Sequence, residues 1–202
     1  MKKLNIALVA GLIGTLAVGQ AMAALVGSKH DFAPGGGTVI SGVTESCKTC
    51  HVPHKPLMNV PLWAHTLSSA SYTLYKDNGG YAGKLGASAY DAAQLGKSKL
   101  CLSCHDGTVA VVTSGISADH NVAGGTIGGT SALSLGNNHP IAVTYPASAT
   151  ADYKLITDAD VKLDGGRVQC TTCHNPHNKV ANTKMLVKTN TSSALCVTCH
   201  LK

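Results

Sequence analysis

The chain has 202 residues, with 16 basic and 10 acidic side chains and a formal charge of +6 at pH 7. Apolar residues make up 44% of it, but it contains only one Trp and one Phe, so a core of large side chains is hard to assemble. The lysines form no dense runs, and the positive charge is therefore no indication of nucleic-acid binding.

The first 23 residues are typical of a secretory signal peptide. Lys2 and Lys3 precede a mostly apolar run at residues 4–19, and the small-x-small pattern after it predicts cleavage behind Ala23. The alternative is a membrane anchor, but the run has 16 residues, fewer than the roughly 20 that a spanning helix needs. We therefore expect an exported protein, extracellular or periplasmic, with no membrane span in the mature residues 24–202.

All eight cysteines occur in four Cys-x-x-Cys-His motifs. This pattern is the attachment signature of a c-type haem, in which two thiols form thioethers with the porphyrin and the adjacent imidazole binds the iron. Zinc sites and disulfide frameworks also use paired cysteines, but neither requires a histidine directly after each pair. We therefore predict four covalent haems. Their sites are Cys47, Cys50 and His51; Cys101, Cys104 and His105; Cys170, Cys173 and His174; and Cys196, Cys199 and His200.

Regular structure is expected to be scarce. Cysteines three residues apart lie on the same side of a helical turn, so each motif should form one such turn, and the stretch at 90–96 favours a further short helix. A segment rich in Gly, Ser and Thr follows the second motif. It contains two strand-like runs, at 108–112 and 141–145, and a hairpin pattern at 161–169 with its turn at Asp164 and Gly165.

An internal repeat divides the chain. The second and fourth motifs share Ser-x-Leu-Cys-x-(Ser/Thr)-Cys-His, and the first and third share Cys-x-Thr-Cys-His-x-Pro-His. We expect one domain at 24–202, with half-modules at about 24–110 and 165–202 joined by the Gly/Ser/Thr-rich insert. Because four haems share so short a chain, the predicted fold class is a multihaem cytochrome c. Its chain would be mostly irregular coil with short helical turns and a few short strands, wrapped around a stacked haem chain.

Six histidines lie outside the attachment motifs and can supply the sixth ligand of an iron. The mature chain offers only Met58 and Met185 as competing ligands, so bis-histidine ligation is the simpler prediction. Prolines in the first and third motifs disfavour helical geometry behind the proximal histidine, which directs His54 and His177 away from their own haem. Three residues span at most about 10 Å, so the iron that such a histidine binds must belong to an adjacent haem. The six histidines are His30, His54, His65, His120, His139 and His177.

The flanking segments resemble the OmcE-type tetrahaem cytochromes, which polymerise into extracellular nanowires. The resemblance covers nearly the whole mature chain and rests on KHDF, CKTCHVPHKPLMNVPLWAH, LCLSCHDGT, NHPI, CTTCHNPHN and the terminal LCVTCH. It implies bis-histidine haems in a continuous stack, with one axial histidine supplied by the neighbouring subunit. His120 lies outside the matching pieces and is expected to be a bystander that binds no iron. The distal candidates that the resemblance implies are His30, His54, His65, His139 and His177, five for four places.

These features favour electron transfer over catalysis. An enzyme needs an open iron position, commonly signalled by an altered attachment motif, whereas all four motifs here end in histidine. We therefore expect no enzyme, but the subunit of a polymeric cytochrome nanowire or a soluble periplasmic electron shuttle; a multihaem oxidoreductase is the remaining alternative. The expected partners are further copies of the chain, other redox proteins or an extracellular electron acceptor. The protein would supply spacing, ligation and insulation, and the haems the redox chemistry.

His30 is a candidate for the ligand that joins subunits. It lies seven positions behind the predicted cleavage site and is followed by APGGG, which can act as a flexible joint. If His30 binds an iron of the next molecule, repeated addition gives an open head-to-tail filament. The alternative is that it binds a haem of its own chain, and the sequence leaves both open.

Overall fold

The computed structural model describes residues 25–37, 42–54, 62–75, 92–106, 135–136, 138–178 and 183–201. The predicted signal peptide at 1–23, the predicted strand at 108–112 and His120 lie outside the described residues. None of the helices within the described ranges has the length and hydrophobicity that a membrane span requires.

Irregular chain dominates the described structure, as predicted, and the helices are short. The longest is α2 (Ser98–His105), while α3 (Cys170–Cys173) and α4 (Cys196–Cys199) are single turns. The first motif begins in a 3-10 turn, η1 (Ser46–Thr49). Each motif thus forms the helical turn that its cysteine spacing predicts. The other 3-10 turns are η4 (Ala92–Gln94), which lies within the predicted helix at 90–96, η5 (Thr183–Met185) and η6 (Thr191–Ser193).

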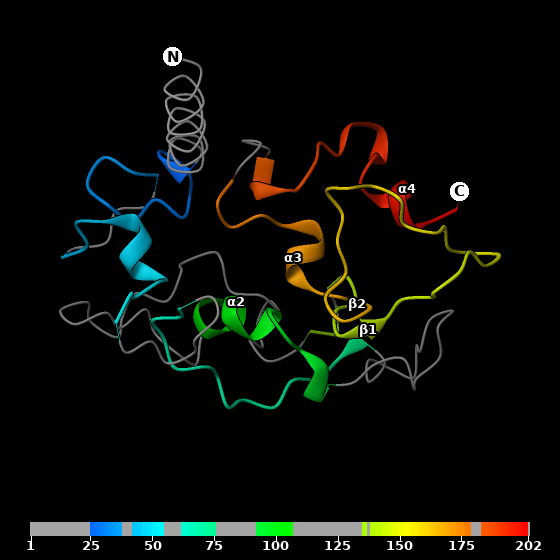
Figure 1. Cartoon of the computed structure of the whole chain (residues 1–202), viewed down its shortest axis with the longest axis horizontal. Helices are drawn as coiled ribbons and strands as arrows, with labels where there is room; N and C mark the ends of the chain where they lie inside the picture. Colours follow the sequence, from blue (N-terminus) through cyan, green and yellow to red (C-terminus); the bar gives the residue numbers. More distant parts are fainter. Residues whose placement is uncertain are drawn as a thin grey trace, which may run out of the picture.

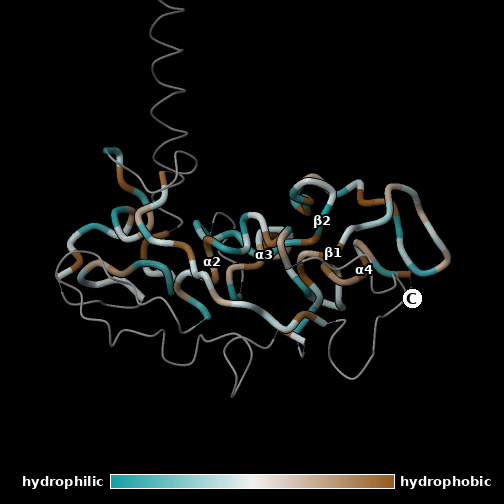
Figure 2. The backbone as a smooth tube through the Cα atoms, turned by 90° about the horizontal axis from the view of Figure 1, so that it is seen from below, coloured by the Kyte–Doolittle hydropathy of each residue, from teal (hydrophilic) through white to brown (hydrophobic). Residues whose placement is uncertain are grey.

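The helical turns of the four motifs follow one another along the longest axis of the molecule, in sequence order (Figure 1). The cyan turn η1 lies at one end, followed by α2, α3 and finally α4. The labelled helices keep the same order when the molecule is turned by 90° (Figure 2). The attachment motifs therefore form a row rather than a cluster.

A two-stranded sheet lies beside this row. Strands β1 (Val143–Thr144) and β2 (Arg167–Val168) pair antiparallel, with Val143 opposite Val168. Strand β1 falls inside the predicted strand at 141–145, which is confirmed over its two central residues.

The turn before β2 is displaced from its prediction by one residue. Asp164 and Arg167 close it with mutual backbone hydrogen bonds of 3.0 and 3.1 Å, so its central residues are Gly165 and Gly166 rather than Asp164 and Gly165. Both glycines have positive φ, 58° and 74°, which a two-residue hairpin turn of this type requires and which glycine adopts at little cost. The partner of β2 is β1, not the segment at 161–163.

The main hydrophobic core is small and joins α2 to the sheet. The single Phe packs in a separate small cluster with Val43, and hydrophobic stretches are spread in short pieces along the chain (Figure 2). A limited core of this kind is what the scarcity of large side chains predicts. The core residues are Tyr72, Leu74, Leu95, Leu102, Leu135, Ala142, Val143, Tyr145 and Val168.

Candidate haem-binding sites

The cysteine pairs are suited to neither of the alternative uses of such pairs. All eight cysteines lie among the described residues, and all are free of disulfide bonds. No group of three or more His, Cys, Asp or Glu side chains within the described ranges is arranged to hold a metal ion, so the pairs do not converge on a four-ligand zinc site. Separate Cys-x-x-Cys-His units remain, which is the donor set that a covalent haem uses.

The surroundings of Cys50 and Cys173 also favour a neutral sulfur. Burial raises the pKa of Cys50 to about 12 and that of Cys173 to about 11. Zinc binding and thiol exchange both require the thiolate, which these positions disfavour. A thioether carries no charge, so the same burial costs a haem-bound sulfur little.

Three of the four proximal histidines are held by a backbone bridge to a second segment. After the helical turn the chain becomes extended, with φ −118° and ψ 138° at His174 and φ −95° and ψ 140° at His200. The residues next to these histidines form ordinary backbone hydrogen bonds to the second segment. The Asn175 N–H, for example, donates to the Met185 carbonyl at 2.8 Å. In the second motif, His105 instead forms the last residue of α2. The bridges are His51 with Trp63, His174 with Leu186, and His200 with Tyr153.

Three distal candidates lie beside a proximal histidine. An imidazole nitrogen binds a metal at about 2 Å, so two imidazoles on opposite sides of one ion have ring centres roughly 6 Å apart. The observed ring separations agree with that value, and each pair joins one attachment motif to a histidine from elsewhere in the chain. The separations are 6.1 Å for His51 and His177, 6.0 Å for His30 and His105, and 6.3 Å for His139 and His200.

In several histidines Nδ1 already has a hydrogen-bond partner, as is usual in histidines that bind a metal through Nε2. Nδ1 of His30 lies 3.2 Å from the Pro176 carbonyl, and Nδ1 of His139 lies 3.1 Å from the Pro140 carbonyl. In proximal His174 the corresponding partner is the Lys184 carbonyl, at 3.0 Å. A carbonyl at Nδ1 fixes the tautomer with its proton there and leaves Nε2 available to iron.

Burial also favours the ligating form of the distal histidines. It lowers the pKa of His30, His139 and His177 below the ordinary histidine value. Only neutral imidazole binds a metal, so these side chains remain in the ligating form at lower pH than an exposed histidine would.

His65 and His54 are placed differently. His65 is 3% exposed, its Nε2 bonds to the Thr49 carbonyl, and its ring packs against Trp63 at 5.7 Å. His54 is exposed, directly after Pro53. His65 therefore has a structural hydrogen bond at the nitrogen that His30 and His139 keep available.

A cavity of about 280 Å³ opens beside His174. Its lining is mixed: Ala159, Pro176 and Val187 are apolar, whereas Asp160 and Lys162 carry opposite charges.

Neighbouring motifs in the sequence have neighbouring thiols. Cys50 interacts electrostatically with Cys104, and Cys173 with both cysteines of α4. Between them, Cys101 hydrogen-bonds to Cys170, and this bond lowers the pKa of Cys170 to about 7. The attachment sites therefore form a continuous series from the first motif to the fourth.

Comparison with known proteins supports the haem interpretation. Residues 164–202, which hold the third and fourth motifs, match the family model described as Doubled CXXCH motif. No curated protein matches the chain. The doubled motif indicates a multihaem c-type cytochrome, and c-type cytochromes are generally extracytoplasmic electron-transport proteins.

Proposed function

We propose that the protein transfers electrons along a row of four covalently attached c-type haems. The four cysteine pairs would hold the porphyrins, and His51, His105, His174 and His200 would be the proximal ligands. When bound, each haem supplies reversible one-electron chemistry, and the chain determines its ligation, spacing and exposure to solvent.

The observation that carries this proposal is the pairing of proximal and distal imidazoles at 6.0–6.3 Å. An iron with histidine on both sides has no open position for a substrate. Closed coordination therefore favours electron transfer over a multihaem oxidoreductase, and we propose that the protein is not an enzyme. Histidine ligation on both sides also implies low reduction potentials, because methionine ligation raises them.

For the third haem we assign His54 as the distal ligand. The first and third motifs share the Cys-x-Thr-Cys-His-x-Pro-His pattern, and His177 of the third lies beside His51 of the first. A reciprocal arrangement would bring His54 to the iron of His174. His65, whose Nε2 bonds to a backbone carbonyl, is the weaker candidate.

The electron carrier could work in two forms, as a polymer or as a soluble shuttle. The sequence resemblance and a row of sites that runs the length of the molecule support a head-to-tail polymer, since a second copy at either end would extend the row. The soluble periplasmic shuttle is favoured by His30, whose ring lies beside His105 of its own chain rather than being free to reach another molecule. We propose the polymer as the working form, with a contact other than His30.

Intact mass spectrometry and electron paramagnetic resonance test the electron-transfer proposal. The mature protein should carry four haems, all low-spin, and His54→Ala should convert one of them to a high-spin form that binds carbon monoxide. His120→Ala, which the sequence predicts to be a bystander, is the control. Fewer than four haems, or carbon monoxide binding by the wild type, would contradict the proposal, and electron microscopy of the secreted protein decides between filament and shuttle.

A further inference from the structure

The helices of the second and third motifs meet through a buried polar network. Ser98 is fully buried and Gln169 is 2% exposed. The Ser98 hydroxyl donates to Gln169 Oε1 at 2.5 Å and accepts the Cys170 N–H at 3.0 Å. Gln169 Nε2 in turn donates to the Gln94 carbonyl at 2.8 Å, so both ends of the amide are used.

The network acts at the first residues of both helices. Ser98 begins α2, three residues before Cys101, and Gln169 is the N-cap of α3, directly before Cys170. The Gln169 N–H also donates to Thr172 Oγ1 at 3.0 Å, which fixes the first turn of α3. The two helices are therefore locked together at their first turns, which carry Cys101 and Cys170.

The surrounding chain leaves this junction little room to move. Gly96 has φ +46°, and a Cβ there would lie 3.3 Å from Gln169 Nε2. Lys97 forms an ion pair with Asp164 at 3.2 Å beside it. Buried hydrogen-bonded groups of this kind are costly to separate, because each partner left behind loses its hydrogen bond without regaining water.

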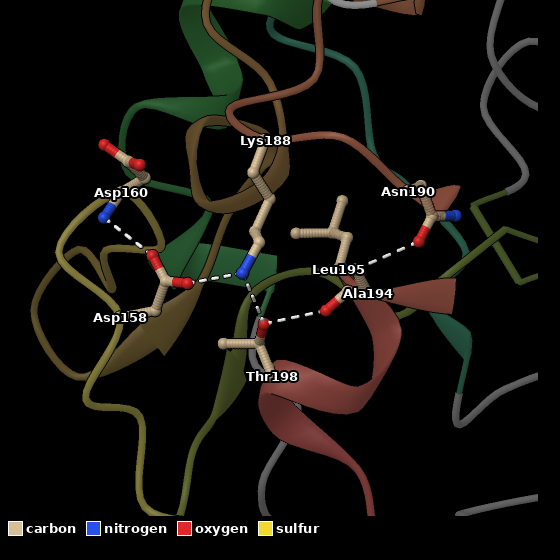
Figure 3. A network of polar contacts seen from close by, with 7 residues as sticks. All are labelled: Asp158, Asp160, Lys188, Asn190, Ala194, Leu195 and Thr198. Carbon is tan, nitrogen blue, oxygen red and sulfur yellow. Dashed lines mark hydrogen bonds and ion pairs between the residues drawn. The ribbon is translucent and has the colours of Figure 1, made fainter. Parts of the chain in front are cut away.

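The polar contacts around α4 are of a different kind (Figure 3). There Lys188 bridges Asp158 at 2.5 Å and Thr198 of α4 at 3.4 Å, and the Lys188 and Asp158 side chains are 26% and 25% exposed. A partly exposed ion pair is screened by water and holds its partners weakly. The dry network therefore holds α2 and α3 together more firmly than this ion pair holds α4.

We propose that Ser98 and Gln169 are positioning residues that set the spacing of the second and third haems. This spacing governs electron transfer between the N-terminal and C-terminal halves of the chain. The inference rests on the proposed electron-transfer function. Neither side chain would ligate iron; each acts through the helix that carries a haem-binding cysteine.

The repeat supplies a matched control. Ser193 occupies the position of Ser98 in the fourth motif, but it is exposed, with φ +62°. Ser103 is a second control, because it is as buried as Ser98 and lies on the same helix, yet its hydroxyl donates to Leu100 within α2 at 2.6 Å.

The test compares Ser98→Ala, Gln169→Leu and the double variant with Ser193→Ala and Ser103→Ala. All are studied as holoproteins with the full haem content verified by mass. Soret circular dichroism reports the coupling of closely packed haems, and pulse radiolysis follows redistribution of an injected electron among them. The axial-ligand spectra report whether the individual sites are intact.

We expect loss of Soret couplet amplitude and slower electron redistribution in Ser98→Ala and Gln169→Leu, with low-spin spectra retained. The double variant should lose less than the sum of the two single variants, since both remove the bond between Ser98 and Gln169. Ser98→Ala leaves the bond from Gln169 to the Gln94 carbonyl in place and serves on its own if Gln169→Leu does not mature.

Unchanged couplet and rates in these variants, or equal losses in the two control variants, would overturn the positioning role. A wild-type protein in which no electron redistributes would instead refute the proposed function. In that case the Soret couplet still decides whether Ser98 and Gln169 set the haem spacing.

Discussion

Removal of the Tyr72 hydroxyl should destabilise the protein, because it deprives a buried carboxylate of a donor. Tyr72 is 8% exposed and Asp106 fully buried, and the hydroxyl donates to Asp106 Oδ2 at 2.6 Å. Asp106 directly follows the proximal His105 and interacts electrostatically with Cys104. The pair therefore joins the segment at 62–75 to the end of α2, beside the second haem site.

The size of the effect follows from this geometry. A hydrogen bond to a charged group contributes about 1.5–3 kcal/mol, and Tyr72→Phe keeps the ring in the core while removing only the oxygen. We expect a loss of about 2 kcal/mol in the free energy of unfolding. In a protein of this length that corresponds to a melting temperature lower by roughly 4–8 °C.

Guanidinium unfolding of the holoprotein measures this loss, and a double-mutant cycle with Asp106→Asn isolates the coupling of the two side chains. A change below about 0.5 kcal/mol, or additive effects in the cycle, would refute the reasoning. The pH dependence is a second check. Burial, and then Asp106, raise the pKa of Tyr72 from 10.0 to about 12, so its contribution is complete below pH 10 and lost as the pH rises towards 12. Tyr72→Phe should lack this alkaline loss.

Three further predictions concern other parts of the chain. Lys188 lowers the pKa of Asp158 below 3.8, so the stabilising effect of this ion pair should be present above that pH and lost as the pH falls below it. The Asp158→Asn variant should not show this loss of stability when it is unfolded by acid. If its stability falls with pH as in the wild type, the ion pair is not the cause. Tyr145→Phe removes bonds to the Lys154 and Cys199 carbonyls at 2.7 and 3.0 Å and should cost about 1 kcal/mol by guanidinium unfolding; no loss would mean that water replaces them. His139→Ala should make one haem high-spin by electron paramagnetic resonance, and four low-spin haems would exclude it as the partner of His200.

Sequence patterns were sufficient where the cause is local. The helical turns follow from cysteine spacing, β1 from the run at 141–145, and the turn before β2 from its glycines, with an error of one residue. The predicted pairing within 161–169 was wrong, because β2 pairs with β1. The left-handed conformations of Lys184 and Ser192 had no such signal, because neither residue favours positive φ. These conformations are stabilised by the surrounding chain rather than by the residues themselves.

The pairing of histidines was beyond sequence reasoning because it depends on contacts between distant segments. The pattern supplied five distal candidates but no basis for matching them to irons, and nothing in it distinguished His65, which bonds to a backbone carbonyl, from the others. Gln169 escaped notice for the same reason: its partner Ser98 is 71 residues away. The repeat did mark Ser98, since the same position holds serine in the fourth motif.

The same long-range contacts argue that the two half-modules are not independent. His177 belongs to the third motif, but its ring lies 6.1 Å from His51 of the first. His30 lies beside His105 and pairs with the Pro176 carbonyl, 146 residues away. A half-module on its own would lose distal histidines or the carbonyls that orient them, and any iron bound to it would lack its sixth ligand. Internal repetition therefore does not imply two folding units here. On the proposed ligation, the contacts that would close the haem sites also join the halves, so a change that loosens the join should alter haem ligation as well.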